Sequence, residues 1–137
     1  MKQGKLHGKT VILTGAGGGI GTATAALLDR EGANLVLADI NLARVQELAQ
    51  GLSRPALAVK CNITRREEVA ELVARAQEKF NTIDVLVNNA GIIIPSLFEN
   101  CSDDQIEKQV AVNLMGTIHA TYAVLPVLIK NGGGNIV

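Results

Sequence analysis

Short apolar runs alternate along this chain with longer segments whose apolar residues recur at helical spacing. Runs rich in Val, Ile and Leu, bounded by Gly, Asn or Pro, are typical of strands buried on both faces of a sheet. Segments in which Ala, Leu, Ile and Val return after about three or four residues predict helices. The expected strands are 10–15, 33–39, 55–61, 83–91 (running into a loop) and 134–137, and the expected helices are 19–30, 41–49, 64–80 and 102–129.

Two of the expected helices carry a signal at their first residue. Thr64 with Glu67, and Ser102 with Gln105, have the spacing of a capping box, in which each side chain bonds the backbone of the other. The second of these helices contains Pro126, which lacks a backbone donor. We expect Pro126 to kink the helix or to end its last turn.

This order of elements predicts an α/β fold. Strands that alternate with helices pair in parallel and are joined by right-handed crossovers, and helices then cover both faces of the sheet. We expect one doubly wound, Rossmann-type domain over residues 1–137, incomplete at its C-terminus because it stops at the fifth strand. Ligands of such sheets bind at the carboxyl ends of the strands, where the strand order reverses.

The composition excludes several classes of protein. The 137 residues are 47% hydrophobic and have zero formal net charge, unlike a disordered chain or an electrostatic nucleic-acid binder. Neither a signal peptide nor a segment approaching the ~18 apolar residues of a membrane span is visible. Cys61 and Cys101 form no CxxC pair, so we expect free thiols in the reducing cytoplasm. No metal-ligand spacing occurs.

The stretch TGAGGGIG, residues 14–21, is the most informative of the chain. Gly15 would let the backbone turn sharply after the strand, and Gly17, Gly18 and Gly19 would let it approach a pyrophosphate. Gly21 would let the helix pack closely on the sheet. The helix N-terminus offers free N–H groups to phosphates. A flexible glycine turn is the alternative, but the strand before the motif and the helix after it favour nucleotide binding.

Asp39 ends the second expected strand, 18 residues after Gly21. A carboxylate there can accept hydrogen bonds from both hydroxyls of the adenosine ribose and would repel a 2′-phosphate. Ile40 follows, and the glycine loop holds no Arg or Lys, so NAD is favoured over NADP. Alternatively, Asp39 is the N-cap of the next helix.

Asparagines follow the later strands and interrupt the last helix. Asn62 could reach an adenine edge or make a local Asx turn before Thr64. In NNAG, residues 88–91, the amides could knit neighbouring strands together beneath a cofactor. Asn113 lies inside an apolar helix, where Asn is unfavourable, so it either bonds the helix backbone or belongs to a polar site. His119, in the same helix, has no evident partner.

Taken together and in this order, TGAGGGIG, Asp39, NNAG and VNLMG resemble the short-chain dehydrogenase/reductase family, in its TGxxxGxG subgroup, over the whole chain. The resemblance implies an NAD-dependent oxidoreductase that interconverts an alcohol and a ketone or aldehyde. It implies that Asn113 is a catalytic asparagine, which holds a water in the proton relay. The implied cofactor-binding residues are Gly15, Gly17, Gly18, Gly19, Ile20, Gly21, Asp39, Ile40, Asn62, Ile63, Asn89, Ala90 and Gly91; the family usually has Asp at position 62.

The family's catalytic Ser and Tyr-x-x-x-Lys do not occur in these 137 residues. Tyr122 is followed four residues later by Pro126 and precedes the fifth strand. We therefore expect an N-terminal portion of an enzyme that takes a small alcohol or carbonyl substrate and binds neither nucleic acid nor membrane. The resemblance implies a homo-oligomer, a dimer or tetramer, when full length. The alternative is a non-catalytic NAD(H)-binding module, or a partner of a full-length homologue.

Overall fold

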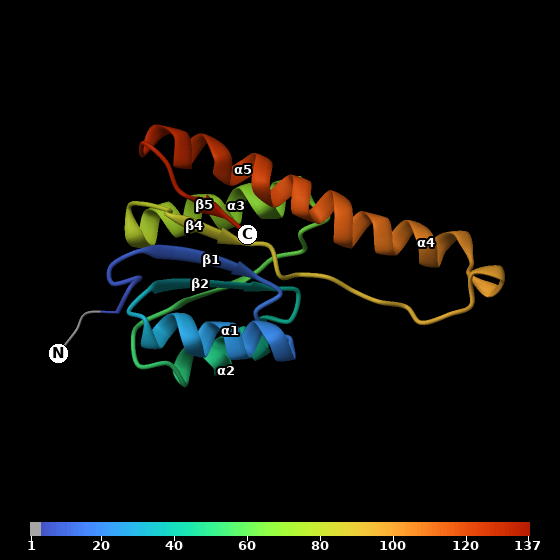
Figure 1. Ribbon diagram of the computed structural model, residues 1–137, viewed down its shortest axis with the longest axis horizontal. Coiled ribbons are helices and arrows are strands. Elements are labelled where there is room, and N and C mark those ends of the chain that lie inside the picture. The colour runs from blue at the N-terminus through green and yellow to red at the C-terminus, as the bar shows by residue number, and fades with distance from the viewer. Residues whose placement is uncertain (1–3) are drawn as a thin grey trace.

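The computed structural model describes residues 4–137, which form one parallel sheet with helices on both faces (Figure 1). The strand order is β3-β2-β1-β4-β5, and every neighbouring pair is parallel. This confirms the predicted doubly wound α/β, Rossmann-type fold. The strands are β1 (Thr10–Thr14), β2 (Asn34–Asp39), β3 (Leu57–Lys60), β4 (Val85–Val87) and β5 (Asn135–Ile136).

The alternation of side chains along β1 builds two separate cores. Val11 and Leu13 pack on one face with residues of α1 and α2, whereas Ile12 packs on the other face with residues of α3 and α5. Successive strand residues point to opposite faces, so an apolar run of this kind is buried on both. The helices are α1 (Gly19–Arg30), α2 (Leu42–Gln50), α3 (Arg66–Phe80), α4 (Asp103–Val110) and α5 (Thr117–Lys130), with a 3-10 turn η1 (Phe98–Asn100) and a π-helical segment η2 (Ala111–Gly116).

One of the two predicted capping boxes is present. Ser102 Oγ accepts from the Gln105 amide at 3.3 Å, and Gln105 Oε1 accepts from the Ser102 amide at 3.0 Å. The prediction for Thr64 and Glu67 is wrong. Helix α3 begins after Arg65, one residue later than the predicted cap, and Arg65 makes no side-chain cap; the Thr64 hydroxyl donates to Asn62 Oδ1 at 2.8 Å.

The segments α4, η2 and α5 form one continuous helix, Asp103–Lys130, whose first part projects beyond the sheet (Figure 1). Pro126 lies inside the helix, which ends four residues later at Lys130, one residue beyond the expected end. Its best window has a mean hydropathy of 1.5, so by length and composition this helix could cross a membrane, which corrects the expectation that no segment approaches that length. Core helices of soluble proteins meet the same criterion.

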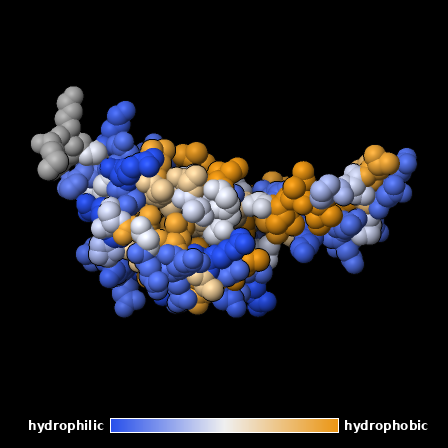
Figure 2. Space-filling model, turned by 90° about the horizontal axis from the view of Figure 1, so that it is seen from below, coloured by the Kyte–Doolittle hydropathy of each residue, from blue (hydrophilic) through white to orange (hydrophobic). Residues whose placement is uncertain are grey.

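The helix packs on the sheet through only part of its surface. Ala120, Val124 and Leu128 are buried against the β-sheet core. Figure 2 shows apolar residues on the arm that projects from the body of the molecule. Exposed apolar side chains of the helix recur at intervals of three or four residues, namely Val110, Leu114, Ile118, Tyr122, Leu125 and Ile129.

Candidate functional site

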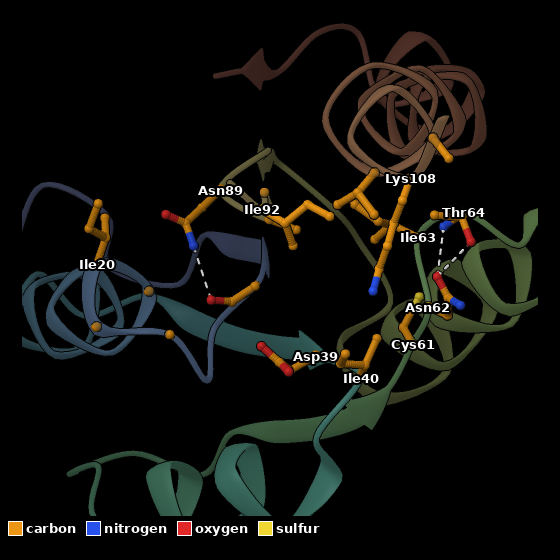
Figure 3. Close-up of a pocket in the computed structure, with 18 residues that line it drawn as sticks. Ile20, Asp39, Ile40, Cys61, Asn62, Ile63, Thr64, Asn89, Ile92 and Lys108 are labelled. Carbon is orange, nitrogen blue, oxygen red and sulfur yellow. Dashed lines mark hydrogen bonds between the residues drawn. The ribbon is translucent and has the colours of Figure 1, made fainter. Parts of the chain in front are cut away.

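A cavity of about 620 Å³ opens at the carboxyl ends of β1 to β4 (Figure 3). The chain leaves β3 at one edge and returns to β4 beside β1, so the strand order reverses between β1 and β4. Ligands of open α/β sheets bind at such a reversal. Of the predicted cofactor-binding residues, the cavity is lined by Gly15, Gly18, Gly19, Ile20, Gly21, Asp39, Ile40, Asn62, Ile63, Asn89, Ala90 and Gly91; Gly17 is the one that does not line it.

Two glycines of the loop between β1 and α1 are required by close packing. Gly15 has φ +65°, and a Cβ there would lie 2.6 Å from Ala90 Cα. A Cβ on Gly21 would overlap the Gly15 carbonyl oxygen and lie 2.7 Å from Ala16 Cα. The motif therefore allows the loop, the first turn of α1 and the end of β4 to approach one another.

The first turn of α1 provides free donors at the cavity. The Gly18 cap has no side-chain hydrogen bond, and the first intrahelical bond is made by the Thr22 amide, to Gly18 O at 2.8 Å. Within residues 4–137, the amides of Gly19, Ile20 and Gly21 have no acceptor. Unpaired amides at a helix N-terminus favour an anion such as a phosphate.

Asp39 lies at the end of β2 with both carboxylate oxygens on backbone donors. Oδ2 accepts from the Gly17 amide at 3.0 Å, and Oδ1 accepts from the Asn41 amide at 2.9 Å. The N-cap of α2 is Asn41, so the alternative role of Asp39 as that cap does not apply. Each carboxylate oxygen has a further lone pair with which it could accept a ligand hydroxyl.

The Asn89 side chain joins β4 to the glycine loop. Its Nδ2 donates to the carbonyls of Thr14 and Gly15, both at 3.0 Å. The Thr14 hydroxyl accepts from the amides of Asn89 and Ala90, both at 3.1 Å, and donates to Val87 O at 3.3 Å. These contacts hold β1 and the end of β4 together, as predicted for the amide of Asn89. The Asn88 side chain instead donates to Thr121 Oγ1 on α5, at 3.4 Å.

Asn62 makes the local turn that was one of its two alternatives. Its side-chain Oδ1 accepts from the Thr64 backbone amide at 3.0 Å and from the Thr64 hydroxyl. The Asn62 backbone amide donates to Glu68 Oε2 at 2.8 Å. The neighbouring Cys61 thiol is buried beside that carboxylate. Burial first, and the Glu68 charge second, raise the pKa of Cys61 to about 11, so the thiol is neutral near pH 7.

Asn113 lies in the π-helical segment η2 and binds the loop after NNAG. Its Oδ1 accepts from the Ile92 amide and its Nδ2 donates to the Ile92 carbonyl, both at 2.8 Å. Of the two alternatives for this mid-helix Asn, its side chain therefore makes the contact outside the helix. A Cβ on Gly91 would lie 3.4 Å from Asn113 Oδ1, so the loop passes close to the helix.

Several lining residues are not indicated by the sequence motifs. Lys108 extends from α4 into the cavity (Figure 3), and Ala111 and Val112 follow it on the same helix. Their spacing of three and four residues places them on one helical face, which is the signal that could have indicated them. Cys61, Thr64 and Ile92, which adjoin predicted residues in sequence, complete the lining.

Comparison with known proteins identifies the family. Residues 9–137 match the family described as short chain dehydrogenase. The chain belongs to the short-chain dehydrogenase family. It is 36% identical over 133 residues to an uncharacterized oxidoreductase of Staphylococcus aureus strain USA300, a match covering 96% of this chain and 58% of that protein. It is 35% identical over 133 residues to one of Staphylococcus epidermidis, covering 97% and 58%.

The short-chain dehydrogenases are a family of oxidoreductases, and members of this family generally use an NAD(P) cofactor. The chain spans a little under 60% of the length of the curated relatives named above. The residues present fit a dinucleotide: free helix amides for a pyrophosphate, a glycine loop without obstructing side chains, and a carboxylate at the end of β2.

Proposed function

We propose that this chain is the NAD(H)-binding part of a short-chain oxidoreductase that interconverts an alcohol and a ketone or aldehyde. The observation that carries the proposal is the convergence of the glycine loop, Asp39 and residues 89–91 on one cavity at the strand-order reversal. In this proposal the amides of α1 bind the pyrophosphate, Asn62 and Ile63 flank the adenine, and residues 89–91 lie beside the nicotinamide ribose. Bound nicotinamide would supply the hydride donor or acceptor.

The preference for NAD over NADP rests on Asp39. Its oxygens accept hydrogen bonds from two backbone amides, which hold the carboxylate in place at the end of β2. A carboxylate can accept from both ribose hydroxyls and repels a 2′-phosphate by like charge. Lys108 brings a positive charge into the same cavity, which reduces this repulsion in part.

In the proposed enzyme, Asn113 holds a water of the proton relay and acts together with Ser and Tyr-x-x-x-Lys residues outside this sequence. Within residues 4–137 no tyrosine lines the cavity: Tyr122 lies on α5, 77% exposed. We therefore propose that the 137 residues alone bind the cofactor without catalysing turnover. The same observation favours the second candidate function, a non-catalytic NAD(H)-binding module that pairs with a full-length homologue.

We further propose a cytoplasmic protein that self-associates as a dimer or tetramer when full length and binds neither nucleic acid nor membrane. The exposed apolar residues of α4, η2 and α5 supply a surface that self-association would bury. Sedimentation of a longer protein that contains these residues, with and without Ile118→Glu, tests this, since the charged side chain should shift the protein toward monomer. Equal monomer fractions in both proteins would contradict it.

Titration with NADH tests the central proposal. We expect saturable binding, detected by NADH fluorescence, with weaker binding of NADPH and no turnover of alcohols by this chain. The matched variant Asp39→Asn removes the charge while keeping the size of the side chain. It should reduce the difference between the affinities for NADH and NADPH. If NADH does not bind, the proposal is wrong; if NADPH binds more tightly, only the preference for NAD is wrong. Alcohol turnover by a longer protein that contains these residues distinguishes the two candidate functions. Turnover supports the enzyme, and NADH binding without turnover supports the non-catalytic module.

A further inference from the structure

The peptide unit of Gly17 is held on both sides, although Gly17 does not line the cavity. Its amide donates to Asp39 Oδ2 at 3.0 Å, and its carbonyl accepts from Arg44 Nη1 at 3.3 Å. A Cβ on Gly17 would lie 3.0 Å from Asp39 Oδ2 and 3.2 Å from Arg44 Cβ. The loop apex is therefore packed between the end of β2 and the first turn of α2.

These contacts close into a ring of hydrogen bonds. The Asn41 amide donates to the other Asp39 oxygen at 2.9 Å, and the Asn41 side chain accepts from the Arg44 amide at 3.2 Å, capping α2. The ring thus runs from Gly17 to Asp39, Asn41, Arg44 and back to Gly17. It fixes the carboxylate and the loop in one arrangement, although Arg44 is 27 residues from Gly17 in sequence.

We propose that Arg44 is a positioning residue for the adenosine half of the cofactor, a role that rests on the NAD(H) binding proposed above. Arg44 holds the Gly17 carbonyl, and so keeps the loop at the distance at which Asp39 can meet the ribose. A loop that is already ordered binds more tightly than one that must be ordered on binding.

Arg44 differs in this role from a cation that contacts a phosphate. Arg44 lies outside the lining of the cavity and acts through Gly17 and Asp39. Its removal should weaken ligands that contain the adenosine ribose, namely NADH and ADP-ribose, by the same factor. Because Arg44 is exposed, its loss should leave the melting temperature nearly unchanged.

The experiment is NADH titration of the 137-residue chain with Arg44→Ala, Arg44→Lys and, as a matched control, Arg66→Ala. Arg66 is an exposed arginine in the first turn of α3 and is absent from the lining. Losing one net hydrogen bond should shift the equilibrium between ordered and disordered loop by about fivefold. Because apparent affinity scales with the ordered fraction, NADH binding by Arg44→Ala should weaken by up to about fivefold. Arg44→Lys keeps a donor and should restore most of the affinity, and Arg66→Ala should bind like the unchanged chain.

A double-mutant cycle with Asn41→Ala tests the ring itself. Asn41→Ala removes the bond between the Asn41 side chain and the Arg44 amide, and so opens the ring. If the bonds of the ring order the loop together, Arg44→Ala should weaken NADH binding less in the Asn41→Ala background than in the unchanged chain. Additive losses, or unchanged NADH affinity in Arg44→Ala, would overturn this inference and leave the proposed function standing. Failure of the unchanged chain to bind NADH would overturn both.

Discussion

Strand β1 begins and ends with a buried threonine, and the two hydroxyls differ in their hydrogen bonding. Thr10 and Thr14 are both buried, at 0% and 1% exposure. At the carboxyl end, the Thr14 hydroxyl has three hydrogen-bond partners. At the amino end, the Thr10 hydroxyl has none among residues 4–137. One strand therefore holds a satisfied polar group beside the cavity and an unsatisfied one far from it.

Glycines repeat the contrast just outside the strand. Gly8 and Gly15 both adopt positive φ, +73° and +65°. A Cβ at Gly8 would meet nothing within 4 Å, whereas one at Gly15 would meet the backbone of Ala90. At the amino end glycine serves the turn alone, but at the carboxyl end it also makes room for the segment that follows β4. Close approach and shared hydrogen bonds are thus concentrated where a ligand would bind.

The largest expected effect comes from Gly15→Ala. Positive φ costs about 1–2 kcal/mol for a side-chain-bearing residue, and the overlap with Ala90 should raise the loss in unfolding free energy to about 3 kcal/mol or more. NADH binding should be abolished. The control, Gly8→Ala, carries the strain without the overlap and should lose only the about 1–2 kcal/mol of the positive φ. Urea denaturation measures both; equal losses would contradict the contrast between the two ends.

Thr14→Val should have the second largest effect. Valine has the shape of threonine without its hydroxyl, so the amides of Asn89 and Ala90 lose their shared acceptor at a cost of about 2 kcal/mol. Its control, Thr10→Val, removes a hydroxyl that has no partner and should leave stability unchanged or increase it by up to about 1 kcal/mol. Urea midpoints distinguish the variants, and a destabilised Thr10→Val would refute the contrast.

A smaller effect concerns Asp29, at the amino side of the sheet. Burial raises the pKa of this carboxyl, but hydrogen bonds from the Ser53 hydroxyl, the Ser53 amide and the Arg54 amide outweigh it, so the pKa lies below its usual 3.8. The contribution of Asp29 is therefore present above about pH 4 and is lost as the pH falls through the folded-state value.

Asp29→Asn should accordingly be less stable at pH 7 and lose less stability between pH 5 and about pH 2 than the unchanged chain. Thermal unfolding across this range measures the difference. Parallel pH profiles for the two proteins would show that Asp29 does not contribute in this way. NADH affinity at neutral pH should not change, because Asp29 is outside the cavity lining.

The smallest effect is chemical. With its pKa at about 11, Cys61 should remain almost unreactive toward iodoacetamide at pH 8, and labelling should increase only as the pH approaches 10. Cys101, which is partly exposed, should be labelled first. Peptide mass spectrometry measures both rates. Because Cys61 lines the cavity, NADH should slow its labelling further; comparable labelling of the two thiols at pH 8 would contradict the prediction.

Sequence patterns indicated most of the fold because each pattern reflects a local cause. The continuous apolar run of β1, the Ser102 box and the Asn41 helix start all depend on neighbouring residues. The errors came where local signals compete. Thr64 had an acceptor in Asn62 as well as a helix end to cap, and the structure uses the first. Pro126 removes one helix hydrogen bond, and the packing of Val124 and Leu128 around it keeps the helix continuous to Lys130.

By itself, the sequence determined the α/β architecture, the glycine loop at the end of β1 and the acid at the end of β2. Hydrophobic periodicity and glycine spacing involve residues that are close in sequence, so they can be read without the fold. Tertiary structure alone decided which groups meet: the Thr14 hydroxyl and the Ala90 amide, 76 residues apart, Arg44 and Gly17, and Asn113 and Ile92, 21 apart. Such contacts depend on strand order and helix placement, which burial of the whole chain selects and no single segment encodes.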